Sequence, residues 1–199
     1  MEYEQPYVFG KHKRGILTIN TQKGYRMKTI VINLFGEPSA GKSTCAMDIT
    51  AKLKRNGITA EYVSEFVKDK VWENDSEVFR HQEYIFGKQS FKMGRVKDKV
   101  QVMVVDSPLI LSAVYDKQLG ENFCATVLNI FNSYNNKNYF LVRNHPYENE
   151  GRLHNEQEAF LIKQEILDKL NEYHIGYDIV ISSEETCNKI VDDVIKEVK

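Results

Sequence analysis

The chain has 199 residues, of which 42% are hydrophobic and 28% are charged, with 11 Gly and only 4 Pro. This length and balance fit a globular domain with a substantial core, and they exclude collagen-like, largely disordered and membrane-spanning chains. Lys and Arg total 27 against 28 Asp and Glu. No overall basic field therefore points to nucleic acid or an anionic membrane as the partner.

The charge is unevenly distributed along the chain. Residues 1–28 carry six basic and two acidic side chains, which leaves 21 basic and 26 acidic side chains in the rest. Residues 1–26 also mix Gly, Lys and isolated aromatics without a sustained helical period. We expect a poorly ordered N-terminal extension over 1–26, followed by one domain over 27–199.

The three cysteines, Cys45, Cys124 and Cys187, lie far apart, with no CxxC pair and no His at metal-ligand spacing beside them. This pattern favours a reducing compartment. The longest hydrophobic runs reach about six or seven residues, too short for a membrane span or for the apolar part of a signal peptide. We expect a cytoplasmic protein with no membrane partner, either a monomer or a homodimer.

From Thr29 onward, strand and helix patterns alternate, which predicts an α/β fold with a parallel sheet and helices on both faces. The five predicted strands span 29–35, 58–64, 100–105, 139–143 and 177–182. The predicted helices span 42–55, about 75–95, 121–133 and 155–173, with a last helix from Glu184.

The segment after the first strand carries the clearest chemical signal. It matches GxxxxGK[ST], the phosphate-binding loop, through Gly36, Glu37, Pro38, Ser39, Ala40, Gly41, Lys42, Ser43 and Thr44. In such a loop, the backbone N–H groups and the helix N-terminus surround the phosphates. Lys42 would reach the β and γ phosphates, and Ser43 would supply a hydroxyl ligand for Mg²⁺. The sequence therefore predicts a nucleotide site between the first strand and the first helix.

Two acidic residues end predicted strands. Asp106 closes the most hydrophobic strand, so it should project from the carboxyl edge of the sheet, where open α/β sheets bind ligands. It is the natural partner for Mg²⁺. Glu65 ends the second strand and would face the same cleft if that strand lies next to the third. One carboxylate can hold the metal while the other accepts a proton from an attacking hydroxyl, but the sequence does not assign the two roles.

Cationic and amide side chains complete the predicted site. Arg143 and Arg152 bracket a polar loop containing Pro and Gly, which is typical of a short lid that brings positive charge over a transferring phosphoryl group. Gln82 has the paired donor and acceptor needed to read the edge of a base. It lies on a predicted helix with Phe79, Tyr84, Phe86 and Phe91, most of which we expect in the core.

With these residues in place, the chain from about Met27 onward resembles the NadR-type AAA family of small P-loop kinases. The resemblance rests on GEPSAGKST, on SEF after the second strand, on QEYIF, on VVDSPL after the third strand, and on VR…PYENEGR. It implies ATP and Mg²⁺ as cofactors, with Lys42, Ser43 and Asp106 in the phosphate and metal roles. It further implies that Glu65 lies near the acceptor hydroxyl and that the two lid arginines are catalytic.

The function favoured by these observations is a Mg²⁺-dependent, ATP-dependent kinase acting on a small nucleoside, nucleotide or ribosyl metabolite. A second interpretation is an ATPase or kinase acting on nucleic acid, such as a modified DNA base, which only the basic N-terminal extension supports. A GTPase switch is disfavoured, because the two NK dipeptides, Asn136-Lys137 and Asn188-Lys189, lack the Asp of a guanine-reading NKxD element.

Overall fold

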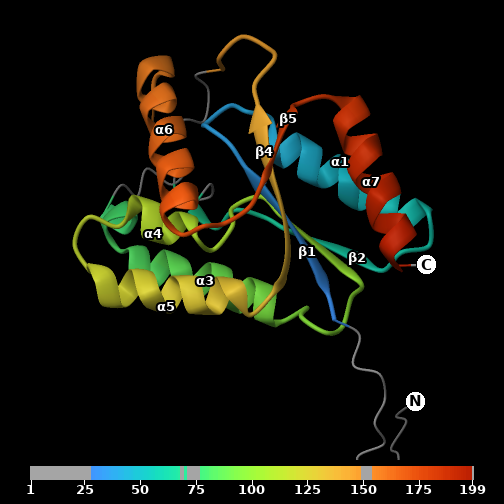
Figure 1. The fold of residues 1–199 in the computed structure, drawn as a ribbon, viewed down its shortest axis with the longest axis horizontal. Helices are drawn as coiled ribbons and strands as arrows, with labels where there is room; N and C mark the ends of the chain where they lie inside the picture. Colours follow the sequence, from blue (N-terminus) through green and yellow to red (C-terminus); the bar gives the residue numbers. More distant parts are fainter. Residues whose placement is uncertain (1–27, 68–69, 71–76, 149–153, 199) are drawn as a thin grey trace, which may run out of the picture.

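A computed structural model describes residues 28–67, 70, 77–148 and 154–198 (Figure 1). Five strands form one sheet in the order β2-β3-β1-β4-β5, and all neighbouring pairs are parallel. The strands are β1 (Ile30–Phe35), β2 (Ala60–Val63), β3 (Val102–Val105), β4 (Asn135–Val142) and β5 (Asp178–Ile181). This confirms the predicted five-stranded parallel sheet. The predicted extension 1–26 and Arg152 lie outside the described residues.

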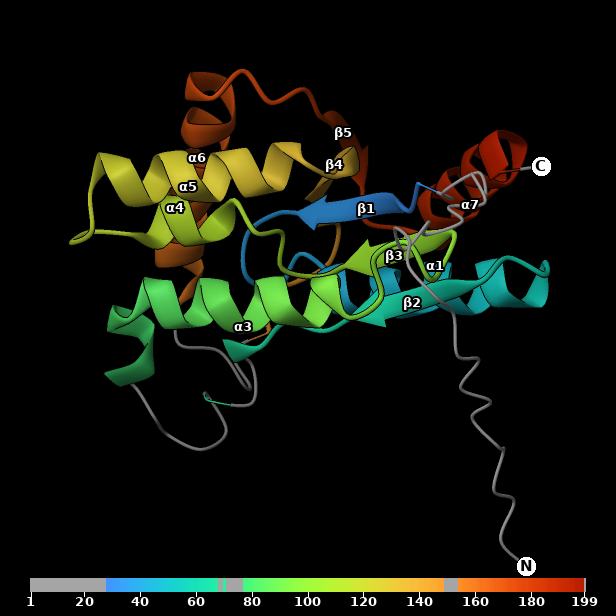
Figure 2. The same ribbon diagram turned by 90° about the horizontal axis from the view of Figure 1, so that it is seen from below.

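Helices cover both faces of the sheet, as predicted (Figures 1 and 2). One face carries α1 (Lys42–Arg55) and α7 (Glu184–Val198). The other carries α3 (Gln82–Gly94), α4 (Leu111–Tyr115), α5 (Glu121–Asn132) and α6 (Glu156–Glu172), with the 3₁₀ helix η1 (Glu77–Arg80) ahead of α3. Two apolar clusters result, one on each face. Within the described residues, no helix combines the length and the apolar character that crossing a membrane requires.

Strand β1 lies at the centre of the sheet, and all six of its residues are buried. A strand covered on both faces requires an almost continuous apolar run, and IVINLF supplies one with a single polar residue. Because every strand is parallel, the carboxyl ends of all five meet at one edge of the sheet. The segments that begin at Gly36, Ser64, Asp106, Arg143 and Ser182 therefore share that edge.

The polar residue of β1, Asn33, explains why β4 begins earlier than the sequence predicts. Its side-chain Nδ2 donates hydrogen bonds of 2.9 Å to the side-chain oxygens of Asn136 and Asn138 on β4. The pattern predicted a strand over 139–143, but the strand spans Asn135–Val142. Polar residues that look like a loop in sequence thus extend the strand, because a buried amide on the neighbouring strand binds them.

Two further elements differ from the sequence prediction. The helix expected over about 75–95 is divided, since η1 ends at Arg80 and α3 begins at Gln82. The short helix α4 follows the turn after β3 and was not predicted. Its first four residues are buried, so packing rather than a repeating surface pattern specifies it.

Candidate nucleotide site

The loop between β1 and α1 has the backbone shape of a phosphate cradle. Gly36, Ser39 and Gly41 all have positive φ angles, of 145°, 63° and 81°. Gly41 is the N-cap of α1, and no side chain caps this helix end. The first turn of α1 also holds no acidic residue. The N–H groups at the start of α1 and the positive end of its dipole are therefore available to an anion.

Lys42 lies over this loop. Its Nζ donates hydrogen bonds to the backbone oxygens of Gly36, at 3.0 Å, and Glu37, at 2.9 Å. The ammonium group is thus held at the loop that the sequence predicts for phosphate. An ammonium bound to neutral carbonyls can exchange them for charged phosphate oxygens, which form stronger hydrogen bonds.

Gly41 also permits a close approach between the loop and the segment joining β5 to α7. A Cβ atom at this position would lie 2.5 Å from Ser182 Oγ. Gly41 and Thr44 line a cavity of about 630 Å³. Its other walls come from α1, from the segment after β4, from the segment that joins β5 to α7, and from the start of α7. The residues of these walls are Cys45, Asp48, His145, Ser182, Ser183, Glu184 and Cys187.

Asp106 follows β3 and is 1% exposed, so its carboxylate is buried at the carboxyl edge of the sheet. Tyr62, on the neighbouring strand β2, donates a hydrogen bond of 3.0 Å from its hydroxyl to Asp106 Oδ2. Burial raises the pKa of Tyr62, and the charge of Asp106 raises it further, whereas hydrogen bonding with Ser43 acts in the opposite direction. Ser43 and Asp106, the two residues predicted as metal ligands, thus both interact with one tyrosine hydroxyl.

Glu65 lies two residues beyond the end of β2 and is half-buried. Its charge contributes to the raised pKa values of Tyr62 and of Tyr115, the last residue of α4, although burial is the main cause at both. The charge of Glu65 therefore acts on the hydroxyl groups of both Tyr62 and Tyr115. Within the described residues, no three His, Cys, Asp or Glu side chains gather as a metal cluster.

Arg143 follows β4, and two carboxylates hold its guanidinium group. Its Nη2 lies 2.7 Å from Glu156 Oε1, and its Nε lies 3.6 Å from Glu37 Oε1 in the loop. The pKa of Arg143 is raised, chiefly by its hydrogen bond to Glu156. The guanidinium group also packs 5.2 Å from the centre of the Tyr147 ring. Arg143 therefore contacts both the loop, through Glu37, and the segment predicted as a lid, through Tyr147.

Part of the predicted lid touches the loop directly. The backbone N–H of Glu148 donates a hydrogen bond of 3.2 Å to Ser39 Oγ. His145 is exposed and also lines the cavity beside Gly41. Residues 149–153, which include Arg152, fall outside the described ranges.

Gln82 begins α3 and is 5% exposed. Its Nε2 donates a hydrogen bond of 2.9 Å to the Phe79 backbone oxygen, but its Oε1 has no partner among the described residues. Gln89, seven residues later on the same face, is 3% exposed, and both of its amide atoms lack a described partner. The expectation that most of the nearby aromatics are in the core fails at Tyr84 and Phe91, which are 44% and 68% exposed.

The comparison with protein-family models identifies the family of this chain. A family model described as an AAA domain matches residues 31–186, which includes every strand except the first residue of β1. The chain belongs to this AAA-domain family. Its parallel sheet and phosphate-binding loop are those of the P-loop NTPase fold, which implies nucleotide binding.

One solved structure that is similar to this chain is that of a deoxyadenosine kinase from M. mycoides, with the products dCMP and a flexible dCDP bound. The TM-score is 0.48 at 14% sequence identity, and the match covers 84% of this chain and 98% of that chain. No curated protein matches this member of the AAA-domain family.

Several residues of the family member's site were not singled out by the sequence. Tyr62 lies within a strand that reads as ordinary β structure, and its hydroxyl reaches Asp106 only because β2 pairs with β3. Gln89 became notable only through its burial without partners. Its seven-residue spacing from Gln82 on one helix face is the signal that could have found it.

Proposed function

We propose that this protein binds ATP through Gly36–Thr44 and transfers the γ-phosphoryl group to a hydroxyl of a small nucleoside, nucleotide or related ribosyl metabolite. The observation that carries the proposal is the position of Lys42 Nζ, within 3.0 Å of two carbonyls of a loop that opens onto an uncapped helix N-terminus. Charge complementarity of this kind favours a polyphosphate.

The donor nucleotide extends from the loop into the 630 Å³ cavity lined by Gly41 and Thr44. Thr44 is the exposed last residue of the motif, so it meets the end of the phosphate chain nearest the ribose. The serines after β5 and the exposed His145 offer hydrogen-bonding groups to the sugar and base.

The residues beside Tyr62 fit a magnesium ion bound together with phosphate. Mg²⁺ prefers oxygen ligands and typically uses one or two carboxylates plus substrate phosphates, retaining several waters. Ser43 supplies a hydroxyl, and Asp106 supplies a buried carboxylate that Tyr62 orients through its hydrogen bond. When bound, the ion neutralises charge on the β and γ phosphates.

Glu65 is the proposed general base. Asp106 is held by Tyr62 and serves the metal, whereas Glu65, which follows the neighbouring strand β2, takes the proton of the acceptor hydroxyl. The carboxylate of Glu65 accepts the hydroxyl proton as the oxygen bonds to the γ-phosphorus and the bond to the β-phosphate oxygen breaks. Arg143 and Arg152 stabilise the negative charge on the transferring group.

The acceptor is proposed to lie over α3. Two glutamines of α3 carry buried polar atoms that have no hydrogen-bond partner among the described residues, namely Gln82 Oε1 and both amide atoms of Gln89. Burying a polar atom without a partner lowers the stability of the folded state, so such atoms are normally paired. A nucleobase carries donors and acceptors along its edge and an apolar face. It would therefore pair with these amides.

Calorimetry on the full chain tests the nucleotide site. MgATP should bind with measurable heat, and Lys42→Ala should abolish turnover or reduce it by about 10²-fold or more, as expected when a group that stabilises transition-state charge is lost. Lys54→Ala, at the other end of α1, is the control, because its exposed side chain lies far from the loop in sequence and its Nζ pairs with Glu61, at 3.6 Å. Absence of heat with every purine triphosphate tested, with Mg²⁺ present, would refute the proposal.

A screen of acceptors tests the reaction. Nucleosides, nucleoside monophosphates and nicotinamide riboside are each added with a non-hydrolysable ATP analogue, and the unfolding temperature is measured. The true acceptor should raise this temperature further in the presence of the analogue than alone, because both ligands bind the folded state. Phosphate transfer to that acceptor is then measured directly with ATP.

A further inference from the structure

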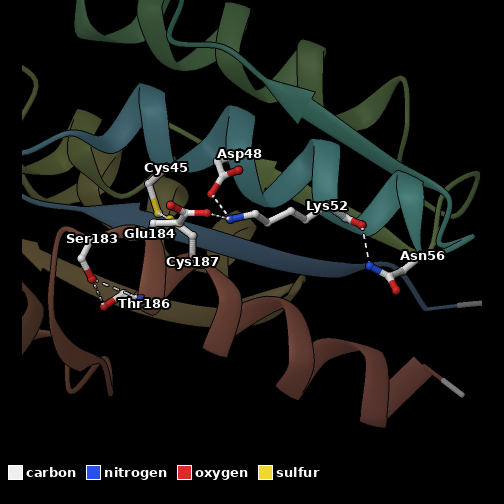
Figure 3. A network of polar contacts seen from close by, with 8 residues as sticks. All are labelled: Cys45, Asp48, Lys52, Asn56, Ser183, Glu184, Thr186 and Cys187. Carbon is white, nitrogen blue, oxygen red and sulfur yellow. Dashed lines mark hydrogen bonds and ion pairs between the residues drawn. The ribbon is translucent and has the colours of Figure 1, made fainter.

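Two cysteines that are 142 residues apart in sequence meet behind the nucleotide loop. Cys45 lies on α1 and Cys187 on α7, and their Sγ atoms are 2.6 Å apart. Figure 3 shows the two side chains pointing toward one another between the helices. The separation exceeds the covalent sulfur–sulfur length by only about 0.5 Å. A disulfide therefore needs little movement of either helix.

Both side chains are buried, at 3% and 4% exposure, but the cavity beside Gly41 and Thr44 is lined by both. The cavity is therefore the side from which a small reagent can approach the pair. The third cysteine, Cys124, lies on α5 on the opposite face of the sheet. The described structure thus separates one pair of facing thiols from one isolated thiol.

Attack on a disulfide requires one thiol of the pair as a thiolate. The two Sγ atoms are 2.6 Å apart, so the second thiol is in place to complete the reaction whichever of the two attacks first.

We propose that Cys45 and Cys187 are a redox-active pair that closes reversibly to a disulfide on reaction with a small-molecule disulfide, and that bound nucleotide slows this reaction. One thiol of the pair, as a thiolate, attacks one sulfur of the reagent and releases the other as a thiolate. The second thiol of the pair loses its proton to that thiolate and attacks the mixed disulfide, which releases the other half of the reagent as a thiolate. The pair is oxidised by two electrons, and the reagent is reduced to two thiols.

The bond would tie the helix that begins with Lys42 and Ser43 to the last helix of the chain. It closes a loop of almost three quarters of the sequence, so it limits the freedom of the unfolded chain and raises the unfolding temperature. The nucleotide part of the inference rests on the proposed function, because it requires the donor to fill the cavity.

Oxidised glutathione is the probe for the first test, used on the folded full chain. Mass spectrometry of the unreduced digest should show one linked peptide pair containing Cys45 and Cys187, and a reductant should separate it. Cys124→Ser is the matched control and should form the same link, whereas Cys187→Ser should not. The inference is overturned if the pair stays reduced, or if Cys124 is the cysteine that links.

A second measurement protects against variants that fail to fold. The wild-type chain alone should unfold at a higher temperature after oxidation, and the increase should disappear on reduction. No change in unfolding temperature on formation of the link would overturn the proposed tie between the helices.

The nucleotide effect is measured as the rate of thiol loss with and without saturating MgATP, after calorimetry has established binding. Slower loss by several-fold is expected. If MgATP binds but the rate is unchanged, the coupling is wrong and the proposed function stands. If MgATP gives no heat, the proposed function fails, while the peptide analysis still decides whether the disulfide forms.

Discussion

The Tyr62 hydroxyl donates a hydrogen bond of 3.0 Å to the buried carboxylate of Asp106. Tyr62 lies on β2, and Asp106 directly follows the neighbouring parallel strand β3. The two residues come together at the carboxyl edge of the sheet. A hydroxyl that donates to a carboxylate fixes the direction of its oxygens. Tyr62 is therefore a positioning residue for the proposed metal ligand.

Tyr62→Phe should lower the free energy of unfolding by about 1.5–3 kcal/mol, because a hydrogen bond to a charged group is lost. It should also raise the Mg²⁺ concentration required for half-maximal activity, which a purely structural role would leave unchanged. Urea unfolding and a metal titration measure the two effects. Tyr84→Phe is the control, since this ring is 44% exposed and packs against Phe66 at 5.5 Å.

Asp106→Asn should raise the Mg²⁺ requirement by at least about tenfold, since even groups that only support a metal ligand contribute 10–100-fold. The amide keeps the size of the side chain and loses its charge. Asp168→Asn, on the exposed surface of α6, controls for the change in net charge. A metal titration that matches the wild-type curve would remove Asp106 from the proposed metal site.

Gly41→Ala should destabilise the protein and weaken nucleotide binding, because the new Cβ would lie 2.5 Å from Ser182 Oγ. Gly57→Ala is a matched control, since its φ of 78° is close to the 81° of Gly41 but no atom lies within 4 Å of the added Cβ. The control should cost only roughly 1 kcal/mol of backbone strain. Calorimetry and thermal unfolding measure both variants.

Adding Ser182→Ala to Gly41→Ala separates the overlap from the backbone strain. Removal of the hydroxyl takes away the closest atom, so the double variant should recover stability to near that of Gly57→Ala. A double variant as unstable as Gly41→Ala would show that Ser182 does not cause the loss.

Gln89→Met should raise the KM for the acceptor by about tenfold, the size of effect expected when a buried polar group of a ligand loses its partner. It should leave the free energy of unfolding unchanged or raise it, because two unpaired buried atoms are replaced by an apolar group of similar volume. Gln118→Met, at an exposed position, is the control. An unchanged KM would place the acceptor elsewhere.

Arg143→Ala should lower kcat by about 10²-fold, while the affinity for ATP changes less, because the proposed role is to stabilise charge in the transition state. Arg152→Ala should behave in the same way. Arg55→Ala, exposed at the far end of α1, is the control. Equal losses in kcat and ATP affinity would indicate that Arg143 only binds the ground state or holds Glu37 in place.

The sequence by itself determined the elements whose signals are local. The bounds of α1 were predicted from Lys42 to Arg55 because a motif starts the helix and Asn56-Gly57 ends it. Strand β1 was predicted because burial on both faces leaves a continuous apolar run. Asp106 and Glu65 were recognised as acids at the ends of two predicted strands. The identity of a side chain and its distance along one strand suffice for such predictions.

Tertiary structure alone decided which distant residues meet. The buried side-chain amide of Asn33 binds Asn136 and Asn138, so the polar residues from Asn135 onward form a strand. Packing of α1 against α7 joins Cys45 to Cys187, which the sequence presents as isolated thiols. Pairing of β2 with β3 delivers the Tyr62 hydroxyl to Asp106. These contacts depend on strand order and helix packing. Local propensity does not encode strand order or helix packing, because burial of the whole core sets both.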